Sequence, residues 1–338
     1  MGGLSRKLVT VQEMRKAGED PLILDSGDLF FSTPDLNKNN IVSEQYRAGS
    51  MLRGYEKIGC DAINVGRYEL LLGLDFLKEK VKSTTIPFIS ANLRDGETGS
   101  LLFEPYRIIQ RGSFTVGIIG LTSMVKDSLA KVTTDDYLET GRSYLKKIKS
   151  MVDIVVMLIN TDQKNYSLLP AKFPDADFIF VSGSTMLTRP SIPQEKEGPY
   201  LYSSGKEGRR LTVIDVNREN DIDRLVDVSY YQNTIDYINR RFERLQKQDP
   251  GRPLVEIYAG QEKTLNLIRD YQQELETMET ILDNAINILE FQNIPMGDTI
   301  KDDPGMLSFV DQSLAACGSL KISPINTKAI KTKISNEP

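Results

Sequence analysis

Residues 21–28 read P-L-I-L-D-S-G-D, and this stretch sets the expected fold of the chain. A short apolar run that ends in turn residues is typical of a buried strand in a parallel sheet. Asp25 and Asp28 then follow the strand on a glycine turn. In α/β proteins, metal and substrate groups bind at the carboxyl ends of the strands. Because aspartate and glycine are also common loop residues, this segment alone indicates a site only weakly.

Strand and helix signals alternate from this stretch up to about residue 230. Helical patterns occur at residues 42–58, 74–81 and 137–151. Further strands are expected at residues 61–65, 86–90, 106–110, 114–119, 153–159, 177–181, 211–216 and 225–228. We expect the last two of these strands to close the sheet. The alternation predicts a layered α/β domain, in which helices cover a sheet.

The pattern changes after residue 231. Apolar residues recur at spacings of three and four in two arms, which the break D-P-G-R-P at 249–253 separates. Such a seam predicts an antiparallel helical hairpin, which either docks a partner or packs against itself or the domain. The seam residues are Ile235, Ile238, Phe242 and Leu245 in the first arm and Ile268, Tyr271, Leu275, Met278 and Leu282 in the second.

These patterns divide the chain into three expected parts. Residues 1–230 form the α/β domain and residues 231–286 form the hairpin. Residues 287–338 supply a strand and then an extended tail, because the sequence becomes rich in Lys, Ser and Pro from about Leu320.

The composition excludes several classes of protein. With 338 residues, 40% hydrophobic and 26% charged, the chain has the composition of a soluble globular protein. A net charge of -5 argues against nucleic acid as the main partner. No apolar run reaches the length of about 18 residues that a membrane span requires. The opening sequence M-G-G-L-S-R-K has no apolar signal segment, so no signal peptide is expected in this numbering.

The chain has no histidine, which excludes Ser-His-Asp and Cys-His catalysis and every imidazole metal ligand. Its two cysteines, Cys60 and Cys317, lie far apart and form no C-x-x-C motif. A disulfide framework and a cysteine zinc site are therefore excluded. The sequence does not decide whether these two thiols pair.

Eight short segments follow one another in a specific order: G-G-L-S-R-K (2–7), D-S-G-D-L-F (25–30), V-G-R-Y-E-L-L-L-G (65–73), I-S-A-N-L (89–93), G-I-I-G-L-T (117–122), D-I-V-V-M-L-I-N (153–160), D-F-I-F-V-S-G-S-T-M (177–186) and S-G-K-E-G-R-R-L (204–211). This succession resembles the N-terminal domain of the 5'-nucleotidase branch of the calcineurin-like metallophosphoesterases. The resemblance implies a four-layered α/β/β/α sandwich, here followed by the helical hairpin. In that family, a two-metal site at the strand ends hydrolyses phosphoesters, often those of nucleotides.

The family's metal ligands are largely replaced here. Asp28 matches the metal-bridging Asp of the family, but Arg67 stands at an Asn ligand and Asn160 at a His ligand. Tyr68 stands at the His that helps to stabilise the transition state. The family's first Asp-x-His motif lies upstream of the glycine pair, so we expect its strand to be missing here. Together with the Gly-His-x-His segment, which reads G-S-T-M here, the resemblance implies a vestigial pocket of Asp25, Asp28, Arg67, Tyr68, Glu69, Asn160, Ser184 and Met186.

This residue set is poorly suited to metal binding. Two divalent ions need several anionic or imidazole ligands to offset their charge. One carboxylate and an amide do not supply them, and the fixed charge of Arg67 would repel a cation. We therefore expect no metal, no cofactor and no catalytic residue. Asp28 or Asp25 should instead pair with Arg67, and Tyr68 or Asn160 should fill the remaining volume by hydrogen bonding.

Three hypotheses about function follow. The first is a catalytically inactive metallophosphoesterase-fold protein that serves as a structural or interaction subunit. The second is a divergent phosphoester hydrolase. The metal ligands of such a hydrolase would be Asp25, Asp28, Glu69 and Asp162. The third is an anion-binding module that uses Arg67 and Lys206 in the vacated pocket.

The partner and the location of the protein are implied only by the resemblance. Some relatives with a similar hairpin and a D-D-P-x-M segment, which occurs here at 302–306, are secreted and joined to multihaem cytochrome modules. A protein partner, with a multihaem cytochrome as one candidate, and a periplasmic or extracellular location are therefore expected. The chain itself has no C-x-x-C-H motif and binds no c-type haem. The oligomeric state is left open.

Overall fold

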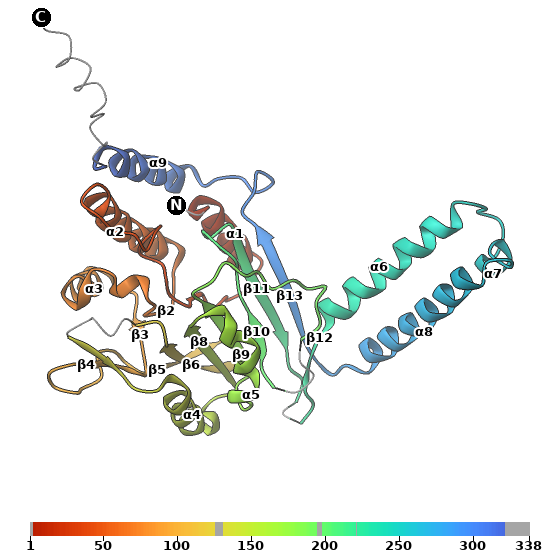
Figure 1. Cartoon of the computed structure of the whole chain (residues 1–338), viewed down its shortest axis with the longest axis horizontal. Coiled ribbons are helices and arrows are strands. Elements are labelled where there is room, and N and C mark those ends of the chain that lie inside the picture. Colours follow the sequence, from red (N-terminus) through yellow and green to blue (C-terminus); the bar gives the residue numbers. More distant parts are fainter. Residues whose placement is uncertain (1–2, 126–130, 195–197, 221, 322–338) are drawn as a thin grey trace, which may run out of the picture. The chain divides into compact units, whose positions relative to one another are not determined.

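The structure is a computed structural model, and it describes residues 3–125, 131–194, 198–220 and 222–321. The chain forms two compact units, whose elements are labelled in Figure 1. The first unit comprises Met1–Leu187, Glu195–Arg209 and Met296–Pro338. The second comprises Thr188–Gln194 and Arg210–Pro295. Its segments therefore alternate along the sequence with those of the first unit.

Two sheets lie at the centre of the first unit. The larger has the order β10-β9-β8-β6-β5, in which only the edge strand β5 runs antiparallel to its neighbour. The smaller has the order β1-β2-β3 and is parallel. The strands are β1 (Leu24–Asp25), β2 (Ala62–Asn64), β3 (Phe88–Ile89), β5 (Tyr106–Arg111), β6 (Phe114–Thr122), β8 (Ile154–Asn160), β9 (Phe178–Ser182) and β10 (Tyr200–Tyr202).

Helices cover the outer face of each sheet. Alternate residues of β6 and β8, such as Ile119 and Met157, pack in one core cluster with Leu145 of α4 (Tyr137–Ile148) and Leu169 of α5 (Leu169–Lys172). Ile63 of β2 belongs to a second cluster, and the helices that contribute to it are α1 (Leu4–Lys16), α2 (Ile41–Ile58) and α3 (Gly73–Lys82). This arrangement follows from the two-residue period of strand side chains.

The two sheets pack directly against each other. A Cβ at Gly120 on β6 would lie 2.7 Å from Asn64 Oδ1 and 2.8 Å from the backbone oxygen of Ile89. Only glycine allows the sheets to approach so closely at this point. The order helix, sheet, sheet, helix confirms the expected α/β/β/α fold.

Helix α9 (Pro304–Ser319) also belongs to the first unit, and the sequence analysis did not predict it. Met306 of α9 is buried in the same core cluster as α1 and α2. Ser43 Oγ on α2 donates a hydrogen bond of 2.8 Å to the backbone oxygen of Cys317. Cys60 and Cys317 are both buried and both free. The expected tail beyond Lys321 lies outside the described residues.

The second unit contains a three-stranded sheet and a helical hairpin. The sheet has the order β11-β13-β12, with strands β11 (Arg210–Asn217), β12 (Leu225–Asp227) and β13 (Asn287–Pro295). The expectation that 211–216 and 225–228 close the main sheet is therefore wrong. Their shared neighbour β13 lies about 60 residues further along the chain, beyond the hairpin, so the local pattern gave no sign of this pairing.

The hairpin itself is confirmed. It consists of α6 (Val228–Gln246) and α8 (Glu262–Asn284), and the short helix α7 (Leu254–Ile257) extends the connection beyond the expected turn. Ile238 and Ile268 of the predicted seam are fully buried. The rings of Phe242 and Tyr271 meet edge to face with their centroids 6.1 Å apart.

The remaining elements of the first unit are short. Strands β4 (Leu93–Asp95) and β7 (Val132–Thr134) form an antiparallel pair, and 3-10 turns lie at Tyr68–Leu70, Lys149–Met151 and Gln163–Leu168. None of the helices in the described ranges combines the length and the apolar character that a membrane crossing demands.

Candidate functional site

Three polar side chains meet at the carboxyl ends of β6, β8 and β9. The sheet register places Thr122, Asn160 and Ser182 side by side. Thr122 Oγ1 donates to Asn160 Oδ1 at 3.1 Å, and Asn160 Nδ2 donates to Ser182 Oγ at 2.8 Å. Ser182 Oγ in turn donates to the backbone oxygen of Ser26, at 2.6 Å. These bonds join the end of the larger sheet to the loop after β1.

The loops after β1 and β2 approach each other through two glycines. Gly27 has φ +99°, and a Cβ there would lie 2.8 Å from the backbone nitrogen of Gly66. A Cβ at Gly66 would lie 2.7 Å from the backbone nitrogen of Asp28. Asp28 itself has φ 66°, a left-handed conformation that few residues other than glycine adopt. The close approach therefore holds Asp28 in a strained backbone conformation.

Glu69 ties these two loops together. Its Oε2 accepts the backbone N–H groups of Asp28 and Gly66, both at 2.9 Å. Its Oε1 accepts those of Leu29 at 2.7 Å and Phe30 at 3.2 Å. Glu69 is fully buried. With four backbone donors on its two oxygens, the carboxyl group has a structural role, which the sequence analysis did not foresee.

Burial controls the titration of Glu69. Desolvation, and then the negative charge of Asp28, raise the pKa of Glu69 to about 8, while the backbone N–H groups of Asp28 and Leu29 act in the opposite direction. Burial also raises the pKa of Asp28. The Tyr68 N–H, the Asn160 side chain and the charge of Arg67 partly offset that shift. Asp28 Oδ1 accepts the Tyr68 N–H at 2.8 Å.

Asp25 has a separate set of partners. Its Oδ1 accepts the backbone N–H of Gly27, and its Oδ2 accepts the Tyr55 hydroxyl, both at 2.8 Å. Burial raises the pKa of Asp25, and these hydrogen bonds and the charge of Lys7 oppose the shift. Lys7 is itself buried, which lowers its pKa, and its Nζ lies 5.8 Å from the centre of the Tyr55 ring. Lys7 and Tyr55 lie on α1 and α2, where the sequence gave no sign of a link to Asp25.

Arg67 does not form the expected ion pair with Asp28 or Asp25. In the described part of the chain, its guanidinium has no carboxylate oxygen within 4.0 Å. The guanidinium instead lies over the ring of Tyr68, with its carbon 5.1 Å from the ring centre. The backbone N–H of Arg67 donates to Asn160 Oδ1 at 3.0 Å, so Asn160 does form the hydrogen bonds that were expected of it.

Ser184 and Met186 follow the end of β9. Ser184 Oγ accepts the backbone N–H of Met186 at 3.1 Å, and the partly buried Met186 side chain packs against the core cluster that includes Ile119 and Met157. Ser203 Oγ donates to the backbone oxygen of Met186 at 2.7 Å. Turn hydrogen bonds and core packing therefore explain the positions of Ser184 and Met186.

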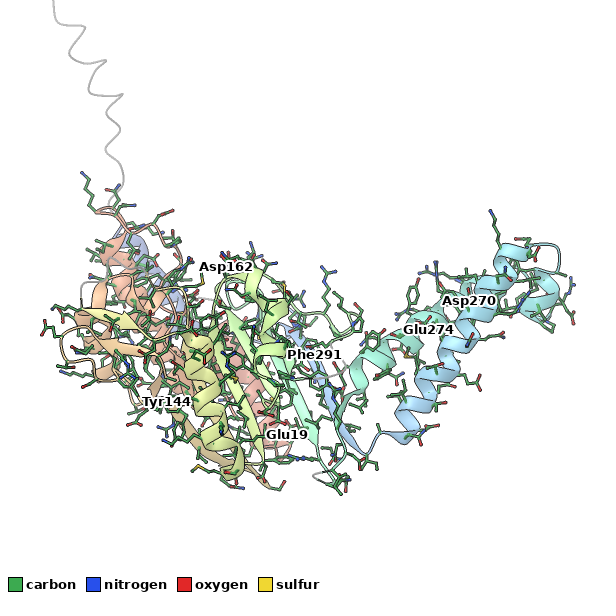
Figure 2. The ribbon with its side chains drawn as sticks, turned by 60° about the horizontal axis from the view of Figure 1, so that its bottom comes forward. Glu19, Tyr144, Asp162, Asp270, Glu274 and Phe291 are labelled. Carbon is green, nitrogen blue, oxygen red and sulfur yellow. The ribbon has the colours of Figure 1, made fainter. Side chains whose placement is uncertain are left out.

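Asp162, a candidate ligand of the hydrolase, and Lys206, a candidate residue of the anion-binding module, have other partners. Asp162 is exposed, as Figure 2 shows at the surface of the molecule, and accepts the backbone N–H of Lys164 at 3.0 Å. Lys206 is half-exposed, with its Nζ 4.0 Å from Glu207 Oε1.

The residues present do not fit a two-metal centre. The Glu69 oxygens and Asn160 Oδ1 each accept two donors, and Asn160 Nδ2 is a donor that repels a cation. Asp28 Oδ1 is bound to a backbone N–H. Across the described ranges, no three Asp, Glu, Cys or His side chains come together in an arrangement that would hold a metal ion.

Sequence comparison identifies curated proteins that are similar to part of this chain. No family model matches the chain. The protein UshA of Salmonella pullorum is 30% identical over 166 residues, which cover 48% of this chain and 28% of the relative. The 5'-nucleotidase of Homo sapiens is 26% identical over 229 residues, which cover 63% of this chain and 38% of the relative. The chain thus spans well under half the length of these curated relatives.

Solved structures show the same fold. The calcineurin-like phosphoesterase YfkN from Bacillus subtilis has a TM-score of 0.58 at 15% identity, over 93% of this chain and 88% of its own. A 5'-nucleotidase precursor from Thermus thermophilus has a TM-score of 0.53 at 20% identity, over 67% of this chain and 47% of its own. The chain therefore has the 5'-nucleotidase-type metallophosphoesterase fold, which confirms the resemblance found in the sequence.

Proposed function

We propose that this chain is a catalytically inactive member of the metallophosphoesterase fold, in which a hydrogen-bonded network replaces the metal centre. The observation that carries the proposal is Asn160, whose amide is fully engaged where the family has a metal-binding histidine. Its oxygen accepts Arg67 N–H and Thr122 Oγ1, and its nitrogen donates to Ser182. A metal ligand needs a free lone pair directed at the ion, and the network leaves none on this side chain in the described structure.

The charges around the strand ends support the same proposal. A pair of divalent ions stabilises the attacking and leaving oxygens of a phosphoester, and anionic ligands must balance the charge of those ions. Both oxygens of Glu69 accept backbone N–H groups from the loops after β1 and β2. Arg67 adds a fixed positive charge whose influence reaches Asp28. Without histidine, the chain also lacks the usual acid that protonates a leaving oxygen.

An inactive domain of this kind would serve as a structural or interaction subunit. The helical hairpin, residues 231–286, is the element that we propose makes contact with a protein partner. Its two long helices leave apolar side chains such as Tyr237 and Leu267 exposed. Exposed apolar residues grouped on one element are typical of interaction sites.

The second candidate is a divergent phosphoester hydrolase, and the 5'-nucleotidase activity named for the human relative favours it. Three of its four candidate ligands, Asp25, Asp28 and Glu69, lie close enough to affect one another's titration. Asp162 is exposed and caps a separate turn. Under this alternative, groups other than these four would have to complete the metal site.

A phosphoester assay separates the two candidates. The full chain is incubated with Mn²⁺ or Zn²⁺ and with p-nitrophenyl phosphate, its bis ester or AMP. We expect no turnover above that of an Asp28→Asn variant prepared in the same way. Metal-dependent turnover that disappears in Asp28→Asn would overturn the proposal and establish the hydrolase.

A further inference from the structure

The helical hairpin leaves apolar side chains beside its buried seam exposed to solvent. Ile238 of α6 and Ile268 of α8 are fully buried. Tyr237 is 47% exposed and Leu267 is 40% exposed. The Tyr237 ring meets the half-buried Tyr271 ring with centroids 6.3 Å apart, so both helices contribute to one open face.

Charged residues flank this apolar face. Helical spacing puts Arg241 and Arg244 of α6 on the side of Tyr237, and Asp270 and Glu274 of α8 on the side of Leu267. Figure 2 labels Asp270 and Glu274 on the blue helix α8. Within the described residues, none of these four charges forms an ion pair within 4.0 Å.

A shallow depression of about 300 Å³ lies beside these carboxylates. It is lined by Asp270, Gln273, Glu274, Thr277 and Met278. Two of its lining residues, Asp270 and Glu274, are acidic, and Met278 adds an apolar side chain. A cationic side chain with an apolar stem, such as arginine, has the matching chemistry.

We propose that this face pairs with the same face of a second copy of the chain, so that two hairpins form an antiparallel four-helix bundle. A two-fold axis makes each contact between the two copies occur twice. If α6 of one copy faces α8 of the other, the basic residues of one helix meet the acidic residues of the other at both places. Arg241 and Arg244 of one copy then lie over Asp270 and Glu274 of the other, and the exposed tyrosine and leucine are covered.

The size of the face is consistent with a reversible dimer. Helix α6 has 19 residues and α8 has 23, so their shared length is about 28 Å at 1.5 Å per residue. Two helices packed side by side are about 20 Å wide, which gives on the order of 600 Å² per copy. The total of about 1,200 Å² is at the lower limit of specific interfaces.

This inference rests on the proposed function only because both make the hairpin a contact element. Sedimentation velocity of the full chain, from about 1 to about 100 µM, measures the association directly. We expect a concentration-dependent dimer that dissociates as salt rises, since its ion pairs lie at the surface. A chain that is monomeric at every concentration would overturn the inference.

Charge-reversal variants identify the interface. Arg241→Glu with Arg244→Glu, and separately Asp270→Lys with Glu274→Lys, should each weaken the dimer at least about tenfold. Mixing the two double variants should restore association, because the pairs are then complementary across the interface. Glu276→Lys, an exposed position on the other side of α8 by helical spacing, is the matched control and should leave the dimer unchanged.

The outcomes also distinguish a failure of the dimer proposal from a failure of the proposal that the site is inactive. Circular dichroism before sedimentation shows whether each variant is folded, and restored association in the mixture shows it independently. A dimer that neither double variant weakens would place the interface elsewhere and overturn the inference. Metal-dependent turnover with the dimer intact would overturn only the inactive site.

Discussion

Glu69 accepts the backbone N–H of Asp28 at 2.9 Å, and Asp28 in turn accepts the N–H of Tyr68, the residue before Glu69, at 2.8 Å. Each loop thus supplies a carboxylate that caps the backbone of the other. In a metal centre the bridging carboxylate would direct its oxygens at the ions. Here the reciprocal contacts hold two loops together, and we regard them as the replacement for the metals.

Removing the Glu69 carboxylate should destabilise the first unit severely. Glu69→Ala leaves four buried N–H groups without an acceptor, and each such group costs about 1–3 kcal/mol. We expect a loss of more than about 3 kcal/mol in the free energy of unfolding, and a smaller loss for Glu69→Gln, which keeps one acceptor oxygen. Guanidinium unfolding followed by circular dichroism measures both. A cost for Glu69→Ala as small as that of Glu290→Ala, an exposed control, would refute this role.

The stability of the chain should depend on pH through Glu69. Its pKa rises from a usual value of 4.5 to about 8 in the folded chain. Between these values the unfolded chain has lost a proton that the folded chain retains, so the unfolding free energy falls as pH rises. The difference in stability between the parent and Glu69→Gln isolates this contribution. We expect that difference to decrease from pH 5 to pH 8, and an increase would contradict the assignment.

Truncation of Arg67 should have little effect. Its guanidinium stacks on Tyr68, a contact worth about 0.5–1 kcal/mol at a partly exposed site, and no carboxylate of the described residues pairs with it directly. Arg67→Ala should therefore cost no more than about 1 kcal/mol in thermal or chemical unfolding. A loss of about 3–5 kcal/mol would instead indicate a buried ion pair with a carboxylate.

Helix α9 should be integral to the first unit. Met306 is 1% exposed in the core cluster, whereas its neighbour Leu307 is 38% exposed. Met306→Ala should cost about 2–5 kcal/mol because it leaves a cavity. Leu307→Ala on the same turn is the control and should cost less than about 1 kcal/mol. Equal effects of the two variants in chemical unfolding would show that α9 is not seated on the core.

Local sequence patterns predicted most elements of the α/β layers. Strands such as β8 are apolar at nearly every position because helices cover one face and a second sheet covers the other. Helix α2, expected at 42–58, is found at Ile41–Ile58. The membership of β11 and β12 in a separate sheet was missed, because their partner β13 comes only after the hairpin. Pairing between distant segments leaves no local period to detect.

The candidate site was only partly predictable. The family resemblance located Asp28 and Asn160, and both do lie at the strand ends. The partners of Glu69 and Asp25 were missed, because backbone N–H groups and residues on other helices become hydrogen-bond partners only once the loops are folded. Arg67 was expected to replace a metal charge, but its side chain stacks on Tyr68 instead. Sequence position alone does not fix the direction of a long flexible side chain.

The most direct test of the central claim is the metal content of the full chain after equilibrium dialysis against Mn²⁺ and Zn²⁺. The network at the strand ends predicts far less than one ion per chain, with no difference between the parent and Asp28→Ala. About one or two tightly bound ions per chain, lost in Asp28→Ala, would contradict the replacement of the metal centre.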